Sequence, residues 1–308
     1  MRTTPTFCYV LVGTEQNPLC EACFVSASLL RRLYPESRIV LVCDFATESV
    51  LAGKDLSFVE PGVEVVSIDV PEIFEDNAVR SRFIKTSFRM LLDGDLVFLD
   101  CDALPFQRFD ELFNHSHSFA AVLDRNAEFV RPYMPEWVEP IYKHFDWKYP
   151  LTRYFNSGVM FMRDNAEMQE LGMMWHENWH DVLDKFQKHQ DQPTLNATLN
   201  ELKIDTKTMD IRFNAMVDSS ILFARNAKIV HYFFNGRRNT FDPESLLQNL
   251  VEELKLEGRI DWSRYENQIS RGDAWVHPTQ SVFKELVCRN YGHAAKVAMT
   301  RIQQKVWR

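Results

Sequence analysis

Apolar and polar positions along the first hundred residues fall into blocks that predict strands separated by helices. The compact apolar runs, which are typical of buried strands, cover residues 7–12, 38–43, 63–68 and 96–99. Two longer segments with helical periodicity cover residues 18–34 and 81–92. Because helix-length crossovers separate these strands, the pattern predicts an α/β fold with a parallel, doubly wound sheet. Ligands of such sheets bind beyond the carboxyl ends of the strands.

The middle of the chain continues this pattern with more interruptions. Further strands are predicted over residues 119–123, 154–162 and 227–234, and a helix over residues 165–188. The segment 129–150 holds four prolines and many aromatic residues. It is predicted to be a long structured loop that covers a substrate, because long loops in compact domains are often functional.

From residue 241 the pattern becomes helical, with a start signal at residues 243–245 and leucines at helical spacing after it. We therefore expect a core over residues 1–240 and a helical C-terminal extension over residues 241–308. The last twenty residues, 289–308, contain five basic residues and no acidic one. They predict a basic amphipathic helix, which either docks on the core as a solvated helix or lies on an anionic membrane surface.

Composition narrows the class of protein. The chain is 45% hydrophobic and 25% charged, which is typical of a folded enzyme. A formal net charge of -8 argues against a nucleic-acid partner, which would need a basic surface. We identify no signal peptide and no apolar run long enough to span a membrane. Six scattered cysteines, several in predicted strands, fit a reducing compartment, so a cytoplasmic location is expected.

Two carboxylates follow the predicted strand over residues 96–99. Asp100 and Asp102 are separated by one residue, and residues i and i+2 of an extended chain point the same way. Both can therefore converge on one divalent cation, and their hard oxygen ligands suit Mg²⁺ or Mn²⁺. Because D-x-D is also frequent by chance, a solvated turn after the strand is the alternative.

Several other segments match one family pattern in order. They are Phe83-Ile84-Lys85, Phe119-Ala120-Ala121-Val122-Leu123-Asp124, Tyr154-Phe155-Asn156-Ser157-Gly158-Val159-Met160, Asp191-Gln192-Pro193-Thr194-Leu195-Asn196, Arg212-Phe213-Asn214 and Ile229-Val230-His231-Tyr232. Together with the D-x-D, they resemble the retaining glycosyltransferases of family 8, the glycogenin and bacterial galactosyltransferase type. The resemblance covers about residues 7–240.

This resemblance implies a GT-A glycosyltransferase fold with a Rossmann-like, mostly parallel central sheet flanked by helices. It also implies transfer of a sugar, with retention, from a UDP-sugar donor to a hydroxyl group of a glycan, glycolipid or protein. The cofactor would be Mn²⁺ (or Mg²⁺), held by Asp100, Asp102 and His231. A diphosphate leaving group needs such a cation, because negative charge develops on it as the glycosidic bond breaks.

The catalytic residues implied by the resemblance are Asp191 and Gln192, which would lie beside the anomeric carbon. Asp191 would stabilise oxocarbenium-like charge or act as a covalent nucleophile, and both roles stay open. N-capping of the predicted helix explains an Asp at this position equally well. The donor-binding residues would be Thr14, Lys85, Cys101, Asp124, Asn156, Ser157, Gly236 and Arg237.

The roles of these donor-binding residues follow from their chemistry. Lys85, Arg237 and Arg238 would counter the charge of the diphosphate. Asn156, followed by Ser157 and a glycine, suits sugar hydroxyls. Thr14, after the first strand, would contact the nucleotide. The chain departs from the family after His231, since it lacks the usual Lys-Pro-Trp, which puts closure of that loop over the phosphates in question.

Two other functions compete with a transferase. An apolar strand followed by Asp100 and Asp102 also resembles the opening motif of haloacid-dehalogenase-type phosphatases, with a nucleophile and a general acid. The sequence has no convincing downstream acidic pair to complete that magnesium site. A non-catalytic module that binds a nucleotide-sugar is the second alternative, but it has no chemical need for both aspartates and the histidine.

Overall fold

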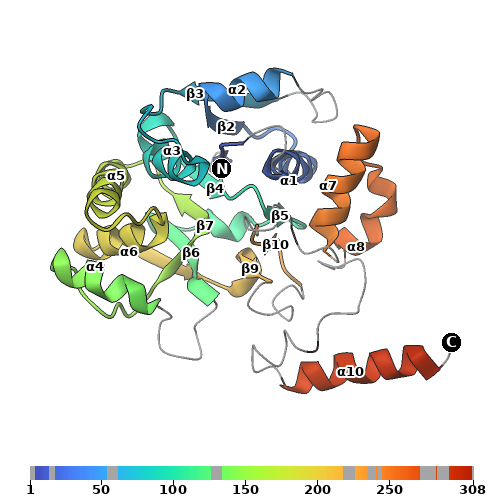
Figure 1. Ribbon diagram of the computed structural model, residues 1–308. Helices are drawn as coiled ribbons and strands as arrows, with labels where there is room; N and C mark the ends of the chain where they lie inside the picture. The colour runs from blue at the N-terminus through green and yellow to red at the C-terminus, as the bar shows by residue number, and fades with distance from the viewer. Residues whose placement is uncertain are drawn as a thin grey trace.

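A computed structural model of the chain describes residues 4–13, 18–53, 62–125, 134–217, 226–234, 241, 245–270, 282 and 291–306. Within these residues a large sheet forms the centre of the molecule, and helices lie on both of its faces (Figure 1). The strands and helices alternate through the first hundred residues, as the blocks of apolar positions predict.

The central sheet has seven strands in the order β3-β2-β1-β4-β7-β6-β8. They are β1 (Thr6–Leu11), β2 (Ile39–Asp44), β3 (Val63–Ile68), β4 (Leu96–Leu99), β6 (Phe119–Leu123), β7 (Phe155–Met162) and β8 (Thr206–Met209). Neighbouring strands are parallel except around β7, which is antiparallel to both β4 and β6. The apolar residues of β1, β2 and β4 are buried, which explains their continuous apolar runs.

A second, three-stranded sheet contains β5 (Ala103–Pro105), β9 (Ala215–Met216) and β10 (Ile229–His231). β5 follows β4 after a turn, and β10 pairs with β5 in the antiparallel direction. In this register His231 lies opposite Ala103. The small sheet therefore brings a histidine from late in the chain to the turn that ends β4.

Helices cover both faces of the central sheet, and others, α10 among them, lie away from it (Figure 1). The helices are α1 (Leu19–Leu33), α2 (Phe45–Ala52), α3 (Asn77–Leu91), α4 (Glu139–His144), α5 (Ala166–Phe186), α6 (Asp191–Glu201), α7 (Leu246–Glu257), α8 (Glu266–Ser270) and α10 (Tyr291–Val306). Short 3-10 helices cover η1 (Asp110–Leu112), η3 (Glu136–Val138), η4 (Ile211–Phe213) and η6 (Trp262–Arg264). Buried residues of α1 and α7 join one apolar cluster, and those of α3, α5 and α6 join another.

Local sequence signals set the ends of several helices. The side chains of Asp44, Asp76, Asn165 and Ser245 accept hydrogen bonds from backbone N–H groups at the starts of α2, α3, α5 and α7. Gly258 ends α7 with a φ of 69°, a left-handed conformation that glycine adopts without strain.

The predicted α/β class and the mostly parallel sheet flanked by helices are confirmed. Among the described strands of this sheet, β7 is the one that departs from the parallel direction. It pairs directly with both β6 and β4 in the antiparallel direction. The segment 129–150 is not a loop throughout its described part, because it contains η3 and α4. The strand predicted over 227–234 is limited to β10.

The predicted boundary at residue 240 stays a prediction. The leucines at helical spacing do form α7, as the pattern after residue 241 predicts. Leu246, Leu247 and Leu250 are fully buried in the same apolar cluster as residues of β1 and α1. The first helix of the predicted extension is therefore packed on the core. Among the described helices, none is long and apolar enough to cross a membrane.

Candidate active site

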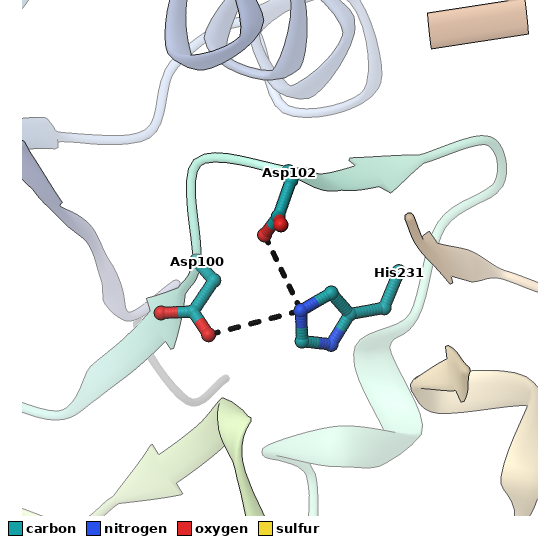
Figure 2. Close-up of side chains that lie close together, drawn as sticks. All are labelled: Asp100, Asp102 and His231. Carbon is teal, nitrogen blue, oxygen red and sulfur yellow. Dashed lines mark ion pairs between the residues drawn. The ribbon is translucent and has the colours of Figure 1, made fainter. Parts of the chain in front are cut away.

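Asp100, Asp102 and His231 form a compact cluster at the carboxyl end of β4 (Figure 2). One ligand atom from each residue lies within 4.8 Å of the others. His231 Nε2 is 3.3 Å from Asp102 Oδ1 and 3.8 Å from Asp100 Oδ2. Within the part of the chain that the structure describes, this is the one group of three or more acidic, histidine or cysteine residues with such spacing.

The backbone fixes the two aspartates on either side of the turn. Asp100 N–H donates to Gly158 C=O on β7 at 2.8 Å, which ties the turn to the neighbouring strand. Tyr232 N–H donates to the Asp102 carbonyl oxygen at 3.0 Å, and Phe234 N–H donates to Asp102 Oδ2 at 2.8 Å. Because Oδ2 has a backbone partner, Oδ1 is the Asp102 oxygen that faces the cluster.

The His231 ring packs against Phe233 and against the backbone of Gly158. The ring of Phe233 stacks on it with centroids 4.1 Å apart and planes 10° from parallel. On β7, a Cβ atom added to Gly158 would lie 2.2 Å from His231 Cε1. A larger residue therefore cannot occupy position 158 unless the ring moves, which gives a reason for the glycine in Asn156-Ser157-Gly158.

A chain of side-chain amides leads away from the buried His231. Its Nδ1 is 3.0 Å from Asn214 Oδ1, and Asn214 Nδ2 donates to Asn156 Oδ1 at 2.8 Å. Asn156 Nδ2 in turn donates to Asp124 Oδ1 at 2.9 Å and to Gln192 Oε1 at 3.1 Å. The cluster of Asp100, Asp102 and His231 and the predicted sugar-binding residues therefore share one hydrogen-bond network.

Asp191 is the first residue of α6, and two cations from α3 flank its carboxylate. Arg82 Nε lies 2.7 Å from Oδ1, and Lys85 Nζ lies 3.2 Å from Oδ2. The Lys85 ammonium is also 2.9 Å from Asp100 Oδ1, so it bridges Asp191 and Asp100. The N-cap of α6 is Gln190, with no side-chain cap. The capping explanation for Asp191 is therefore wrong.

The charges around Asp191 keep it ionised. Burial raises the pKa of its carboxyl group, but Lys85 and then Arg82 outweigh this effect and lower the pKa to about 2. For Asp102, burial likewise raises the pKa, but His231 and backbone N–H groups bring about a net decrease. Both carboxylates are therefore poised to act as anions at neutral pH.

A cleft of about 380 Å³ joins these groups. This volume lies in the range typical of small-molecule sites. The residues lining it include Asp100, Asp102, His231, Lys85, Arg82, Asn156, Ser157, Asp191 and Gln192. Pro135 and Trp137, from the segment predicted to cover a substrate, also line the cleft. Trp137 is 38% exposed, although large aromatic side chains are usually well buried.

The remaining predicted donor-binding residues have different positions. Ser157 Oγ is 3.4 Å from Lys85 Nζ, inside the cleft. Asp124 accepts a hydrogen bond from Asn156 but is not among the cleft-lining residues. Cys101 lines the cleft, but its buried Sγ donates to the Val10 carbonyl oxygen at 3.2 Å. Thr14, Gly236, Arg237 and Arg238 lie outside the described residues.

Two residues of the site were absent from the predicted set. Arg82 precedes Lys85 by three positions, so both lie on one face of α3, and this spacing could have identified it. Asn214 belongs to a segment that resembles a motif of the family, but it contacts a histidine seventeen positions later in the sequence, His231. No local sequence signal predicts that contact.

The comparison with known families gives a direct match. Residues 94–238 match the family described as "Glycosyl transferase family 8". The resemblance to glycosyltransferase family 8 is thereby confirmed. The matched segment includes Asp100, Asp102, Asn156, Asp191 and His231. No curated protein sequence matches the chain.

Solved structures agree on the fold. The galactosyltransferase LgtC, in complex with donor and acceptor sugar analogs, is 14% identical with a TM-score of 0.52, over 84% of this chain and 99% of that one. An active-site mutant of LgtC gives 13% identity and a TM-score of 0.56, over 85% and 99% of the two chains. The glycosyltransferase GlyE of Streptococcus pneumoniae TIGR4 is 13% identical with a TM-score of 0.52, over 91% of this chain and 66% of that one. The fold is therefore that of GT-A glycosyltransferases.

Proposed function

We propose that this family 8 protein is a metal-dependent, retaining glycosyltransferase that moves a sugar from a UDP-sugar to a hydroxyl acceptor. The observation that carries the proposal is the cleft in which the Asp100, Asp102 and His231 cluster lies beside Asp191 and Gln192. A glycosyl transfer needs charge compensation for a diphosphate and polar groups at the anomeric carbon, and the cleft offers both.

The cluster fits a divalent cation. Two carboxylates and one imidazole, with ligand atoms within 4.8 Å of one another, form a donor set that suits Mn²⁺, and Mg²⁺ is the alternative. When bound, the cation would neutralise charge on the diphosphate as the bond to the sugar breaks. The buried Lys85, 2.9 Å from Asp100, adds a second positive charge on the same side of the cleft.

Asp191 would serve the donor sugar. Its two cationic neighbours, Arg82 and Lys85, lower its basicity and fix its orientation. This environment favours a role in stabilising oxocarbenium-like charge over attack as a nucleophile. Gln192 Oε1 accepts from Asn156 Nδ2 and from Ser157 N–H, both at 3.1 Å, so its –NH₂ group is the part suited to a sugar hydroxyl.

The acceptor would enter past the described residues of segment 129–150. Trp137 lines the cleft with an exposed aromatic ring, and such rings stack on the apolar faces of sugars. This supports a glycan or the glycan portion of a glycolipid over a protein hydroxyl. The carboxyl group of Asp191 and the ring of Trp137 would thus belong to the donor and acceptor ends of one cleft.

A cytoplasmic location and peripheral membrane contact are further parts of the proposal. Five cysteines among the described residues are buried and form no disulfide, in keeping with a reducing compartment. The predicted basic helix corresponds to α10, which lies at the edge of the molecule (Figure 1). Exposed Met299 and Ile302 on α10 would supply apolar contacts with a lipid surface.

The proposal is tested by UDP release from a panel of UDP-sugars without acceptor, with Mn²⁺ or with a chelator. The expected result is slow hydrolysis of one donor that needs Mn²⁺ and is lost in Asp102→Asn. Asp110→Asn is the matched control, because Asp110 is an aspartate in η1, away from the cleft. Turnover that persists in Asp102→Asn would contradict the metal assignment.

The wild type and its variants also distinguish the transferase from a phosphatase and from a non-catalytic binding module. Release of phosphate from p-nitrophenyl phosphate, lost in Asp100→Asn, would indicate a phosphatase. Mn²⁺-dependent UDP binding without turnover of any donor or transfer to any acceptor would indicate a binding module. Neither result is expected, because a binding module does not require the ion-paired Asp191 and a phosphatase does not require the amide network.

A further inference from the structure

We infer that Asn214 is a positioning residue that fixes the tautomer of His231, so that Nε2 presents its lone pair to the cation. This inference rests on the proposed metal centre and extends it to a residue that does not itself touch the metal. The evidence is the chain of amide hydrogen bonds that runs from β7 to His231, in which each link determines the orientation of the next.

The first link is Asn156, whose amide orientation is set by two partners of fixed character. The backbone N–H of Gly158 can only donate, and it donates to Asn156 Oδ1 at 2.9 Å. The carboxylate of Asp124 accepts, and it accepts from Asn156 Nδ2 at 2.9 Å. A flipped Asn156 amide would lose both bonds, so the oxygen and nitrogen positions follow from the network.

The second link is Asn214, which is fully buried on the loop after η4. The atom that contacts Asn156 Oδ1 must be a donor, so it is Asn214 Nδ2, at 2.8 Å. Asn214 Oδ1 therefore faces His231 Nδ1 at 3.0 Å. Because this oxygen can only accept, His231 Nδ1 must carry a hydrogen.

The third link is the neutral imidazole itself. With a hydrogen on Nδ1, Nε2 carries the lone pair, and it points at Asp102 Oδ1 and Asp100 Oδ2, 3.3 and 3.8 Å away. Three electron-pair donors converging on one point form a site for a cation. The stacked ring of Phe233 and the close approach of Gly158 to Cε1 and Nδ1 restrict movement of the His231 ring.

The same network couples the metal centre to the donor sugar. Asn156 contacts Asn214 through its oxygen and Gln192 through its nitrogen. A change at Asn214 therefore removes a partner from a side chain that also orients Gln192. We expect the loss of Asn214 to weaken metal binding first and the sugar contact second, since the metal ligand is its direct neighbour.

The test uses the full chain and two substitutions of similar size. Asn214→Leu removes both amide contacts, whereas Asn214→Asp keeps an oxygen that accepts from His231 Nδ1. Asn178→Leu is the matched control, because Asn178 on α5 bonds to Thr198, outside this network. Mn²⁺ affinity is measured by titration calorimetry, and ¹⁵N NMR of the histidine rings is recorded with ¹¹³Cd²⁺ bound, using His231→Gln to assign the signal.

In the wild type, Nδ1 should keep its hydrogen and Nε2 should couple to ¹¹³Cd. Mn²⁺ affinity should fall about 10-fold to 100-fold in Asn214→Leu, the range for outer-shell partners of metal ligands. Asn214→Asp should retain more affinity than Asn214→Leu, and Asn178→Leu should bind as the wild type does. Coupling to Nδ1, or wild-type affinity in Asn214→Leu, would overturn the inference. A wild type that binds no metal would overturn the metal centre and the inference together.

Discussion

Gly158 packs directly against the ring of a proposed metal ligand. An added Cβ would lie 2.2 Å from His231 Cε1 and 2.7 Å from Nδ1. Gly158→Ala should therefore displace the ring, weaken Mn²⁺ binding at least about tenfold, and destabilise the fold by about 1–3 kcal/mol. Calorimetric Mn²⁺ titration and thermal unfolding measure these effects. Gly292→Ala, at a position with nothing within 4 Å of the added Cβ, is the control. Unchanged Mn²⁺ affinity in Gly158→Ala would mean that His231 is not a ligand.

Asp191 carries a charge that the donor sugar would meet. Asp191→Asn preserves size but removes the anion paired with Arg82 and Lys85. Donor hydrolysis should slow by about 100-fold or more, equivalent to roughly 2.7 kcal/mol of barrier, while UDP and Mn²⁺ still bind. Single-turnover kinetics with the preferred donor measure this. A variant with wild-type turnover would exclude Asp191 from the reaction.

Trp137 is an exposed aromatic residue that lines the cleft, at its proposed acceptor end. Trp137→Ala should raise the KM for a glycan acceptor by about tenfold, the effect of losing roughly 1.4 kcal/mol of stacking. Donor hydrolysis without acceptor is the internal control and should not change. If Trp137→Ala slows donor hydrolysis as much as transfer to the glycan, Trp137 acts on the donor or on folding instead of on the acceptor.

Single residues also show the limits of the sequence analysis. Asp100, Asp102, His231, Asp191 and Gln192 could be identified because ordered motifs place them at strand and helix ends. The structure brings all five into one cleft. Their supporting contacts could not be predicted, because they depend on side-chain directions across distant segments. The hydrogen bond between Asn214 and Asn156, for example, joins residues separated by fifty-eight positions.

At the scale of elements, long periodic segments were predictable and short ones were not. Residues 18–34 and 165–188 form helices close to their predicted bounds, because an apolar face must repeat along them. β5, β9 and β10 have two or three residues each, too few for a periodic signal. The direction of β7 depends on its neighbours in the sheet, and its buried apolar run does not encode it.

The contact between α3 and α5 should make stability depend on pH. His176 Nδ1 lies 2.7 Å from Thr86 Oγ1. Burial first, and then His180, lower the pKa of His176 from 6.5 to about 4. Between these values the unfolded chain binds a proton that the folded chain does not, so the free energy of unfolding should decrease as the pH falls from 6.5 to about 4.

Urea unfolding measured across this pH range tests the effect. His176→Gln should remove part of the pH dependence, on the order of 1–2 kcal/mol over the range after allowance for partial exposure of the ring. His144→Gln, at an exposed position on α4, is the control and should leave the pH dependence unchanged. If the free energy of unfolding of His176→Gln depends on pH as that of the wild type does, the pKa of His176 is the same in the folded and unfolded chains.

At the scale of the whole molecule, the site forms where two sheets meet. β4 delivers the aspartates from the central sheet, and the small sheet returns His231 to them from 129 residues further along the chain than Asp102. On the other side, α3 and α6 bring Lys85 and Asp191 to the same cleft. Motifs that lie far apart in the sequence thus become neighbours in the fold. Their order along the chain therefore helps to identify the fold.

The central claim is that the Asp100, Asp102 and His231 cluster holds a divalent cation that binds the diphosphate of the donor. Calorimetric titration of UDP into the protein with Mn²⁺, and again with a chelator, tests it most directly. UDP should bind in the presence of Mn²⁺, and its affinity should fall at least about tenfold, or 1.4 kcal/mol, with chelator and in Asp102→Asn. Equal UDP affinity under all three conditions would show that the cluster holds no cation that binds the diphosphate.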